Sequence, residues 1–217
     1  ILAADHVYKM NYARMLADHL EMRADATVAC IEVPGESAPG LGIMDIGDDG
    51  RVTAFVEKPD TPDALPQSAG RPGHVLGSMG IYVFNTDFLC AQLERDAADP
   101  ASSHDFGRDV IPYLVGRREL HAHRFVDSCV NMGGERPYWR DVGTIDAYWE
   151  ANIDLTKVVP ELNLYDDAWP ILSRQPQLPP AKFVFDGDML RGTALDSLVS
   201  SGCIVSGATV RRSILFS

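Results

Sequence analysis

An acidic and a basic side chain stand next to each other where an apolar run stops. Phe55-Val56 leads directly into Glu57 and Lys58, and Pro59 follows. Proline has no N–H and favours an extended backbone in the residue before it, so Glu57 and Lys58 are predicted to end a strand. A carboxylate can accept hydrogen bonds from sugar hydroxyls, and an ammonium can hold a phosphate. The pair therefore suits a sugar phosphate, although a plain surface ion pair would leave the same pattern.

Two aspartates also follow strand-like segments. Asp5 comes directly after the apolar residues 1–4, and Asp141 ends Trp139-Arg140-Asp141 just before a predicted helix. Both are expected at the carboxyl edge of a parallel sheet, where substrate crevices form. Two such carboxylates suit one Mg²⁺, which prefers a few acidic oxygens together with water and phosphate. Either aspartate alone would more often cap a helix or lie in a turn. The histidines beside the candidate segments are given no role: His6 and His104.

The composition limits the class of protein. The chain has 217 residues, of which 46% are hydrophobic and 23% charged, ordinary values for a soluble globular protein. Its net charge of −12 argues against nucleic acid or an anionic membrane as a partner. No apolar run approaches the roughly 20 residues of a membrane span, and no signal peptide is recognisable. The four cysteines lie far apart, which argues against structural zinc and fits free thiols in a reducing cytoplasm.

Alternating strand and helix patterns predict an α/β fold with a mostly parallel sheet. Residues 12–20 have the apolar spacing of an amphipathic helix, and residues 42–46 and 51–56 flank a Gly-Asp-Asp-Gly turn typical of a hairpin. Residues 59–76 are rich in proline and glycine and are predicted to form a mobile loop. The remaining strands are predicted at residues 1–4, 26–33, 79–84 and 120–126. Helices are predicted at 86–97, from about residue 105, and at 145–156. Ser102-Ser103 is the predicted N-cap of the second helix, and Thr144 is that of the third.

The pattern changes after residue 160. Residues 161–182 are rich in proline and lack periodicity, which is typical of a linker. Beyond them apolar residues recur every six positions, at Leu198, Ile204, Val210 and Phe216. This repeat, with small residues between, predicts the start of a left-handed parallel β-helix. Because residues 1–4 have the pattern of a central buried strand and the repeat stops within a rung, we expect the chain to be truncated at both ends.

Six segments then match one family, in order along the chain. They are Asp5-His6-Val7-Tyr8-Lys9, Phe55-Val56-Glu57-Lys58-Pro59, Ser78-Met79-Gly80-Ile81-Tyr82-Val83-Phe84, Ser103-His104-Asp105-Phe106-Gly107, Tyr138-Trp139-Arg140-Asp141-Val142-Gly143-Thr144 and Leu178-Pro179-Pro180-Ala181-Lys182-Phe183. With them the chain resembles the bacterial ADP-glucose pyrophosphorylases, that is, the glucose-1-phosphate adenylyltransferases. The resemblance implies an incomplete Rossmann-like nucleotidyltransferase domain over 1–160, a linker over 161–182 and the start of a left-handed β-helix over 183–217.

The resemblance also implies a reaction and a set of roles. AMP would pass from ATP to α-D-glucose 1-phosphate, giving pyrophosphate and ADP-glucose, the glucosyl donor of glycogen synthesis. A phosphate oxygen would attack, so no protein nucleophile is expected. The catalytic set would be Asp5 and Asp141, holding Mg²⁺, with Lys58 on the phosphate of glucose 1-phosphate. The groups that position the sugar would be Glu57, Ser78 and the backbone at Gly42.

The sequence departs from the family in one respect. The Gly-rich, Arg-containing loop that binds the nucleotide phosphates is not in the sequence, so this chain alone is expected to be inactive. The full-length protein is expected to be an allosteric homotetramer in the cytoplasm. Two alternatives stay open: a transferase that uses UTP, dTTP or GTP, and a non-catalytic regulatory subunit of the same fold. The presence of Asp5, Asp141 and Lys58 counts against the regulatory subunit. A hexapeptide-repeat acyltransferase would need more rungs and a histidine between them.

Overall fold

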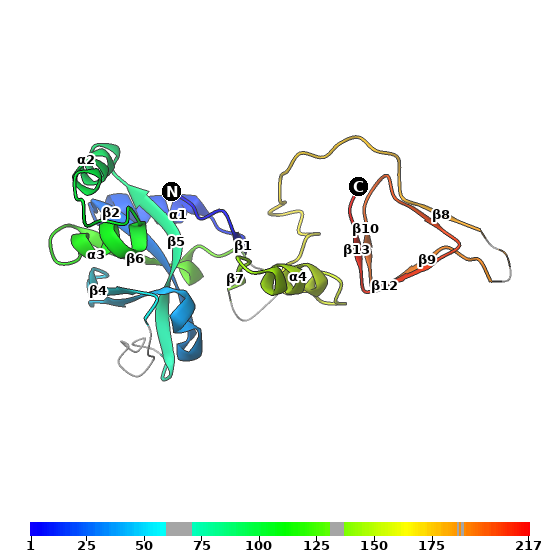
Figure 1. Ribbon diagram of the computed structural model, residues 1–217, viewed down its shortest axis with the longest axis horizontal. Helices are drawn as coiled ribbons and strands as arrows, with labels where there is room; N and C mark the ends of the chain where they lie inside the picture. The colour runs from blue at the N-terminus through cyan, green and yellow to red at the C-terminus, as the bar shows by residue number, and fades with distance from the viewer. Residues whose placement is uncertain (60–70, 131–136, 186, 188) are drawn as a thin grey trace. The chain divides into compact units, whose positions relative to one another are not determined.

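The computed structural model describes residues 1–59, 71–130, 137–185, 187 and 189–217 (Figure 1). Contacts divide the chain into two compact units, one of residues 1–4 with 10–129 and one of residues 5–9 with 130–217. Residues 130–160 therefore group with the C-terminal region in this division, and the domain boundaries at 160 and 182 stay a prediction. None of the helices in the described ranges has the length and apolar character needed to cross a membrane.

The first unit is built on a five-stranded sheet in the order β4-β3-β5-β2-β6. Its strands are β2 (Ala26–Pro34), β3 (Gly42–Ile46), β4 (Val52–Glu57), β5 (His74–Phe84) and β6 (Leu120–Arg124). β2 and β6 are parallel, whereas β5, β3 and β4 add antiparallel pairs, so the described sheet is mixed. The α/β class and the hairpin are confirmed. The hairpin turn is closed by the N–H of Gly47, which donates to the carbonyl of Arg51 at 2.9 Å.

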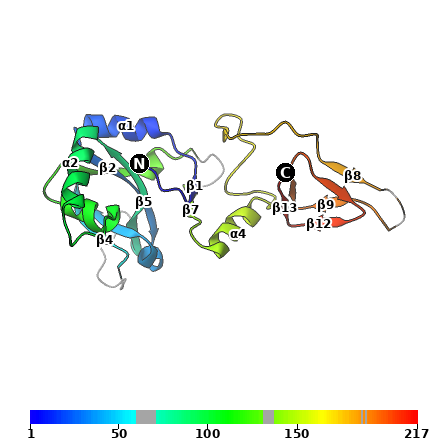
Figure 2. The same ribbon diagram turned by 45° about the horizontal axis from the view of Figure 1, so that its top comes forward.

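Helices cover both faces of this sheet (Figure 2). They are α1 (Tyr12–Glu21), α2 (Thr86–Ala97), the π-helix η3 (Phe106–Val110) and α3 (Ile111–Leu114), with 3₁₀ turns at η1 (Gly35–Gly40) and η4 (Phe125–Asp127). Val28 and Cys30 of β2 pack with Ile111 and Leu114 in the main core. Thr27 points to the opposite face of the sheet, where its Oγ1 lies at hydrogen-bond distance, 2.8 Å, from Nδ1 of His19 in α1. The alternation of side chains along β2 thus separates the two helical layers.

Two local predictions need correction. The helix after residue 105 is capped by Asp105, whose side chain accepts from the N–H of Arg108 at 2.9 Å, rather than by Ser102-Ser103. An aspartate directly before the first turn places its carboxylate in reach of free N–H groups, which residues two positions earlier cannot do. The loop predicted over 59–76 ends early, because β5 begins at His74. Its residues 60–70 lie outside the described residues.

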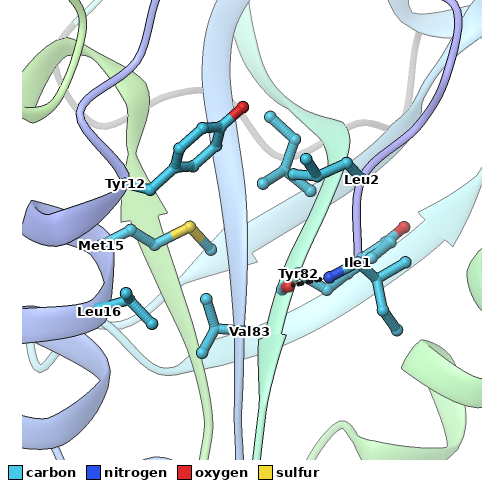
Figure 3. Close-up of a pocket in the computed structure, with 8 residues that line it drawn as sticks. Ile1, Leu2, Tyr12, Met15, Leu16, Tyr82 and Val83 are labelled. Atoms are coloured by element: carbon cyan, nitrogen blue, oxygen red, sulfur yellow. Dashed lines mark hydrogen bonds between the residues drawn. The ribbon is translucent and has the colours of Figure 1, made fainter.

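The buried parallel strand predicted at residues 1–4 is wrong. Ile1 and Leu2 are about half exposed, and their backbone partners in the described part of the chain lie in β5, where Leu2 forms an antiparallel bridge with Ile81. The amino group of Ile1 donates to the carbonyl of Tyr82 at 2.9 Å (Figure 3). These residues line an apolar pocket of about 210 Å³ together with Met15 and Leu16 of α1. Burial of a strand needs neighbours on both edges, and the apolar pattern alone does not supply them.

The second unit begins with a two-stranded antiparallel ladder, β1 (His6–Tyr8) with β7 (Trp139–Asp141). Helix α4 (Ile145–Asp154) follows, and Thr144 caps it as predicted, its Oγ1 accepting from the N–H of Ala147 at 3.2 Å. Residues 161–181, all described, contain no helix or strand. Lys9 of this unit is buried and its Nζ bonds Asp166 at 3.0 Å, which ties the irregular segment to the end of β1.

Six short strands then form parallel ladders, as the six-residue repeat predicts. They are β8 (Lys182–Val184), β9 (Thr193–Leu195), β10 (Leu198–Val199), β11 (Ile204–Ser206), β12 (Thr209–Arg211) and β13 (Ile214–Leu215). β8 pairs with β11, β9 with β12 and β10 with β13. Figure 1 shows these orange and red strands along the sides of a triangular coil. The prediction that a parallel β-helix starts here is confirmed.

The core of the first unit gives a stability prediction. Leu114 of α3 is fully buried, whereas Leu20, also near the end of a helix, is 73% exposed. Leu114→Ala should lower the free energy of unfolding by about 2–5 kcal/mol, because it removes buried methyl groups and leaves a cavity. Leu20→Ala should change it by less than about 0.5 kcal/mol. Urea denaturation of the full-length protein checks both, and equal losses would contradict the placement of the core.

Candidate functional site

The sequence-predicted sugar-phosphate residues come together at one end of the β4-β3-β5 part of the sheet. Gly42 is the first residue of β3 and pairs directly with Glu57, the last residue of β4. On the other side of β3, Ile43 pairs with Gly77 of the antiparallel strand β5. Gly42 and Ser78 are therefore the next positions on these two strands, towards the same end of the sheet. The register therefore places all three positions side by side, in residues separated by up to 36 positions in the chain.

Two glycines make room for the carboxylate of Glu57. A Cβ at Gly42 would lie 2.7 Å from Glu57 Oε2, and one at Gly107 would lie 2.7 Å from its Cδ. Both distances are far below van der Waals contact, so a side chain at either position would force Glu57 to move. Gly107 lies in η3 and was given no role from the sequence, although its segment carried part of the family resemblance. A backbone packed against a carboxylate is a spatial feature that spacing along the chain does not show.

Burial is the main influence on the pKa of this carboxyl group. The Glu57 side chain is 18% exposed, and burial raises its pKa above the ordinary value of 4.5. The neighbouring ammonium of Lys58 and the guanidinium of Arg108 act in the opposite direction on this pKa, while Asp105 adds to the rise. The environment therefore favours a partner that donates hydrogen bonds to Glu57, as sugar hydroxyls do.

Lys58 is placed differently from its neighbour. Its side chain is 55% exposed, and its Nζ lies 3.9 Å from Glu57 Oε1, beyond hydrogen-bond distance. Its backbone has φ +44°, in the left-handed region, and its N–H donates to the carbonyl of Leu41 at 3.0 Å. The strand thus ends in a turn at Lys58, directly after Glu57. An ammonium that is not tied into a short ion pair can bind an anion from solution.

Ser78 and Tyr82 continue the polar lining along β5. Ser78 is 8% exposed, and its Oγ accepts from the N–H of Gly80 at 3.3 Å. Burial raises the pKa of the Tyr82 hydroxyl, a hydrogen bond with Ser78 lowers it, and the charge on Glu57 raises it again. The Tyr82 ring stacks on Phe106 with centroids 5.7 Å apart. Tyr82 and Phe106 were not assigned from the sequence, and both belong to the hydrophobic core of the first unit.

The second unit brings the two predicted metal carboxylates together. His6 pairs with Asp141 in the β1–β7 ladder, and the N–H of Val142 donates to the carbonyl of Asp5 at 2.8 Å. Asp5 precedes β1 and Asp141 ends β7, so the expected convergence at the edge of a parallel sheet is corrected to convergence across an antiparallel ladder. In antiparallel pairs, residues at the start of one strand and the end of the other are neighbours. The proximity was predicted, but the geometry behind it was not.

The donor set fits a bound divalent cation. Asp5, His6 and Asp141 each offer one ligand atom, and these atoms lie within 4.8 Å of one another. A Cβ at Gly143 would lie 3.0 Å from Asp141 Oδ1 and 3.2 Å from Asp5 Oδ2, so a side chain there would crowd both carboxylates. The N–H of Gly143 donates to Asp141 Oδ1 at 2.7 Å and fixes that carboxylate. Both aspartates are exposed, which leaves positions for water and substrate oxygens around a cation.

Comparison with known proteins gives two family matches. Residues 1–158 match the family described as nucleotidyl transferase, and residues 179–217 match the C-terminal hexapeptide family described as GlmU-like. Among curated relatives, glucose-1-phosphate adenylyltransferases from Nitrosospira multiformis, Nitrosomonas europaea and Dechloromonas aromatica are 64%, 62% and 59% identical over the whole chain. The chain spans 50%, 50% and 49% of the lengths of these relatives.

The glycine next to Glu57 gives a second prediction. Gly107→Ala should lower the free energy of unfolding by about 1–3 kcal/mol, because the new methyl group displaces a partly buried carboxylate. The cost should largely disappear in a Glu57→Ala background, where the displaced group is gone. Gly40→Ala is the control, since no atom lies within 4 Å of the position that a Cβ would take there. Denaturation midpoints of the four-variant cycle measure the coupling, and a cost for Gly107→Ala that is independent of Glu57 would contradict the enclosure.

Proposed function

This chain belongs to the nucleotidyl transferase family, and from that premise we propose that it is part of a glucose-1-phosphate adenylyltransferase. Curated relatives of that name match the whole chain, and the chain covers about half of each. The observation that carries the proposal is the group at the end of β4, where an enclosed carboxylate stands beside an ammonium that is half exposed. A hydroxyl-binding group next to a phosphate-binding group suits a sugar phosphate.

In the proposed reaction, AMP passes from ATP to α-D-glucose 1-phosphate and yields ADP-glucose and pyrophosphate. An oxygen of the sugar phosphate attacks the α-phosphorus of ATP, the bond from that phosphorus to the bridging oxygen breaks, and pyrophosphate leaves with that oxygen. The attacking group belongs to the substrate, so the protein contributes position and charge rather than a nucleophile. We propose that Lys58 binds the phosphate of glucose 1-phosphate, and that Glu57, Ser78 and the backbone at Gly42 bind the sugar.

We propose Mg²⁺ as the cofactor, with Asp5 and Asp141 as the residues that would hold it. The exposed carboxylates, the space beside Gly143 and the donor distances support this assignment. When bound, the cation would neutralise phosphate charge and polarise the phosphorus–oxygen bonds. Asp141 is held by the N–H of Gly143, so its orientation is set before a ligand arrives.

Two other functions remain to be separated from this one. A transferase using UTP, dTTP or GTP would share the sugar-phosphate group, and a regulatory subunit would share the fold without turnover. The identity of 56–64% to adenylyltransferases favours ATP, and the presence of Asp5, Asp141 and Lys58 favours a catalytic chain. We further propose, from the family resemblance, an allosterically regulated homotetramer in the cytoplasm. Light scattering on the full-length protein tests the tetramer.

Product formation by the full-length protein tests the reaction. With glucose 1-phosphate and Mg²⁺, ATP should give ADP-glucose, and UTP, dTTP and GTP should give at most a few per cent of that rate. Asp5→Asn and Asp141→Asn should each lower kcat by about a thousandfold or more, since an amide keeps the volume but loses the charge that binds the cation. Circular dichroism provides the folding control. Turnover with another nucleotide, or normal kcat in either variant, would overturn the corresponding assignment.

The role of Lys58 is tested by comparing the two substrates. Lys58→Ala should raise the KM for glucose 1-phosphate about ten- to a hundredfold, because a lost charge-assisted hydrogen bond costs about 1.5–3 kcal/mol. The KM for ATP should change much less. Lys182→Ala is the matched control, because Lys182 is an exposed lysine in β8, among the strands of the second unit. Equal rises in both KM values would show that Lys58 does not contact the sugar phosphate.

A further inference from the structure

A cavity with a basic lining lies at the start of β4, at the opposite end of that strand from Glu57. Its volume is about 440 Å³, and its lining comes from residues 51–53 and from residues 116–120, which lead from α3 into β6. Its charged residues are Arg51, Arg117, Arg118 and Glu119. In a chain with a net charge of −12, three arginines against one acidic residue are a local exception. None of them has a part in the proposed reaction.

The backbone holds both segments of the cavity in place. The N–H of Ala122 in β6 donates to the carbonyl of Gly50 at 2.9 Å, which ties the hairpin turn to β6. The N–H groups of Arg117 and Arg118 both donate to the carbonyl of Leu114, at 3.0 and 3.2 Å. Because these bonds fix the chain on both sides of the cavity, little ordering of the backbone is needed when a ligand binds.

Arg51 and Glu119 largely neutralise each other. Nη2 of Arg51 lies 2.6 Å from Oε2 of Glu119, and Nε of Arg51 lies 3.3 Å from Oδ2 of Asp49. This arginine is therefore engaged by two carboxylates, and the acidic side chain of the lining is engaged by an arginine. The positive charge that remains for a ligand belongs to Arg117 and Arg118.

Aromatic rings hold these two guanidinium groups. Cζ of Arg117 lies 4.7 Å from the centroid of the Tyr113 ring, and its Nη1 donates to the Tyr113 carbonyl at 2.7 Å. Cζ of Arg118 lies 5.9 Å from the centroid of Phe88, and this side chain forms no ion pair in the described part of the chain. A guanidinium held over a ring keeps most of its N–H donors available at its edge. Both arginines are exposed and can be reached from solvent.

We infer that this cavity binds the phosphate group of a small phosphate ester through the guanidinium groups of Arg117 and Arg118. A guanidinium presents its N–H donors in a planar fork that matches two phosphate oxygens. A phosphate monoester has a charge of about −1.5 to −2 at neutral pH, which two guanidinium groups balance. The volume of about 440 Å³ leaves space for the organic part, since sites for small molecules measure about 300–1,000 Å³. The inference does not depend on the proposed reaction.

Arginine labelling with phenylglyoxal tests the site in the full-length protein, with each modified residue identified by peptide mass spectrometry. Glucose 6-phosphate should slow the labelling of Arg117 and Arg118 at least about fivefold. Inorganic phosphate at the same concentration should slow it less, and sodium chloride of equal ionic strength should leave it unchanged. Arg211 is the internal control, because it is an exposed arginine in β12 of the second unit.

Three variants locate the binding, with the labelling of Arg117 as the readout. Arg118→Gln should raise the concentration of glucose 6-phosphate needed for half protection about tenfold, because it removes one of the two charges. Glu119→Gln should lower that concentration about threefold, because it removes the acidic group of the lining while an amide oxygen can still accept from Arg51. Lys58→Ala should leave it unchanged, since Lys58 belongs to the separate sugar-phosphate group.

The outcomes separate the possibilities. Protection of Arg117 and Arg118 by glucose 6-phosphate, with Arg211 unaffected, supports the inference. Labelling that glucose 6-phosphate slows no more than sodium chloride does overturns it, and this readout of the parent protein does not depend on how the variants fold. Equal protection by inorganic phosphate overturns the assignment to a phosphate ester. Protection that disappears in Lys58→Ala overturns the location, whereas failure of the transfer reaction would be seen separately in ADP-glucose formation.

Discussion

Carboxylates packed against glycine backbone are the feature on which both candidate groups depend. Glu57 lies where a Cβ at Gly42 or Gly107 would collide with it, and Asp5 and Asp141 lie where a Cβ at Gly143 would crowd them. Close approach of this kind keeps a carboxylate in one orientation without enclosing it in other side chains. The same device therefore holds the Glu57 carboxylate in one unit and the carboxylates of Asp5 and Asp141 in the other. Substitution of Gly107 or Gly143 would act first on the carboxylates, whereas a side chain at Gly42 would also collide with the core residue Phe55.

The charge of the protein sets a second constraint. A chain with a net charge of −12 has no general attraction for phosphates, so every phosphate must be bound by local positive charge. Lys58 supplies such a charge in the first unit, and the carboxylates of the second unit can supply one only by holding a cation. Glu57 lies beside Lys58, and burial raises the pKa of its carboxyl group while the Lys58 ammonium lowers it.

The sequence predicted helices, strands and turns better than it predicted which segments lie next to one another in the fold. Helix 86–97, the hairpin around residues 47–50 and the cap at Thr144 follow from local patterns and are found as predicted. The strand at residues 1–4 failed because burial depends on what lies beside a segment, which an apolar pattern does not contain. At Glu57 the family resemblance supplied Gly42 and Ser78, whereas Gly107, Tyr82 and Phe106 were given no role. These three residues lie in segments that are 25 or more positions from Glu57 in the chain, and only the fold brings them into its neighbourhood.

The two candidate groups differ in how firmly the fold holds them. Glu57 and Ser78 belong to a five-stranded sheet covered by helices, and such a sheet keeps its geometry without a ligand. Asp5, His6 and Asp141 lie on a ladder of three residue pairs, which would be marginally stable alone. Its additional support comes from the Lys9–Asp166 ion pair and from the cap of α4, each of which fixes one end of a ladder strand. The group at Glu57 therefore rests on the larger sheet, whereas the group at Asp5 and Asp141 rests on a short ladder that depends on these two contacts.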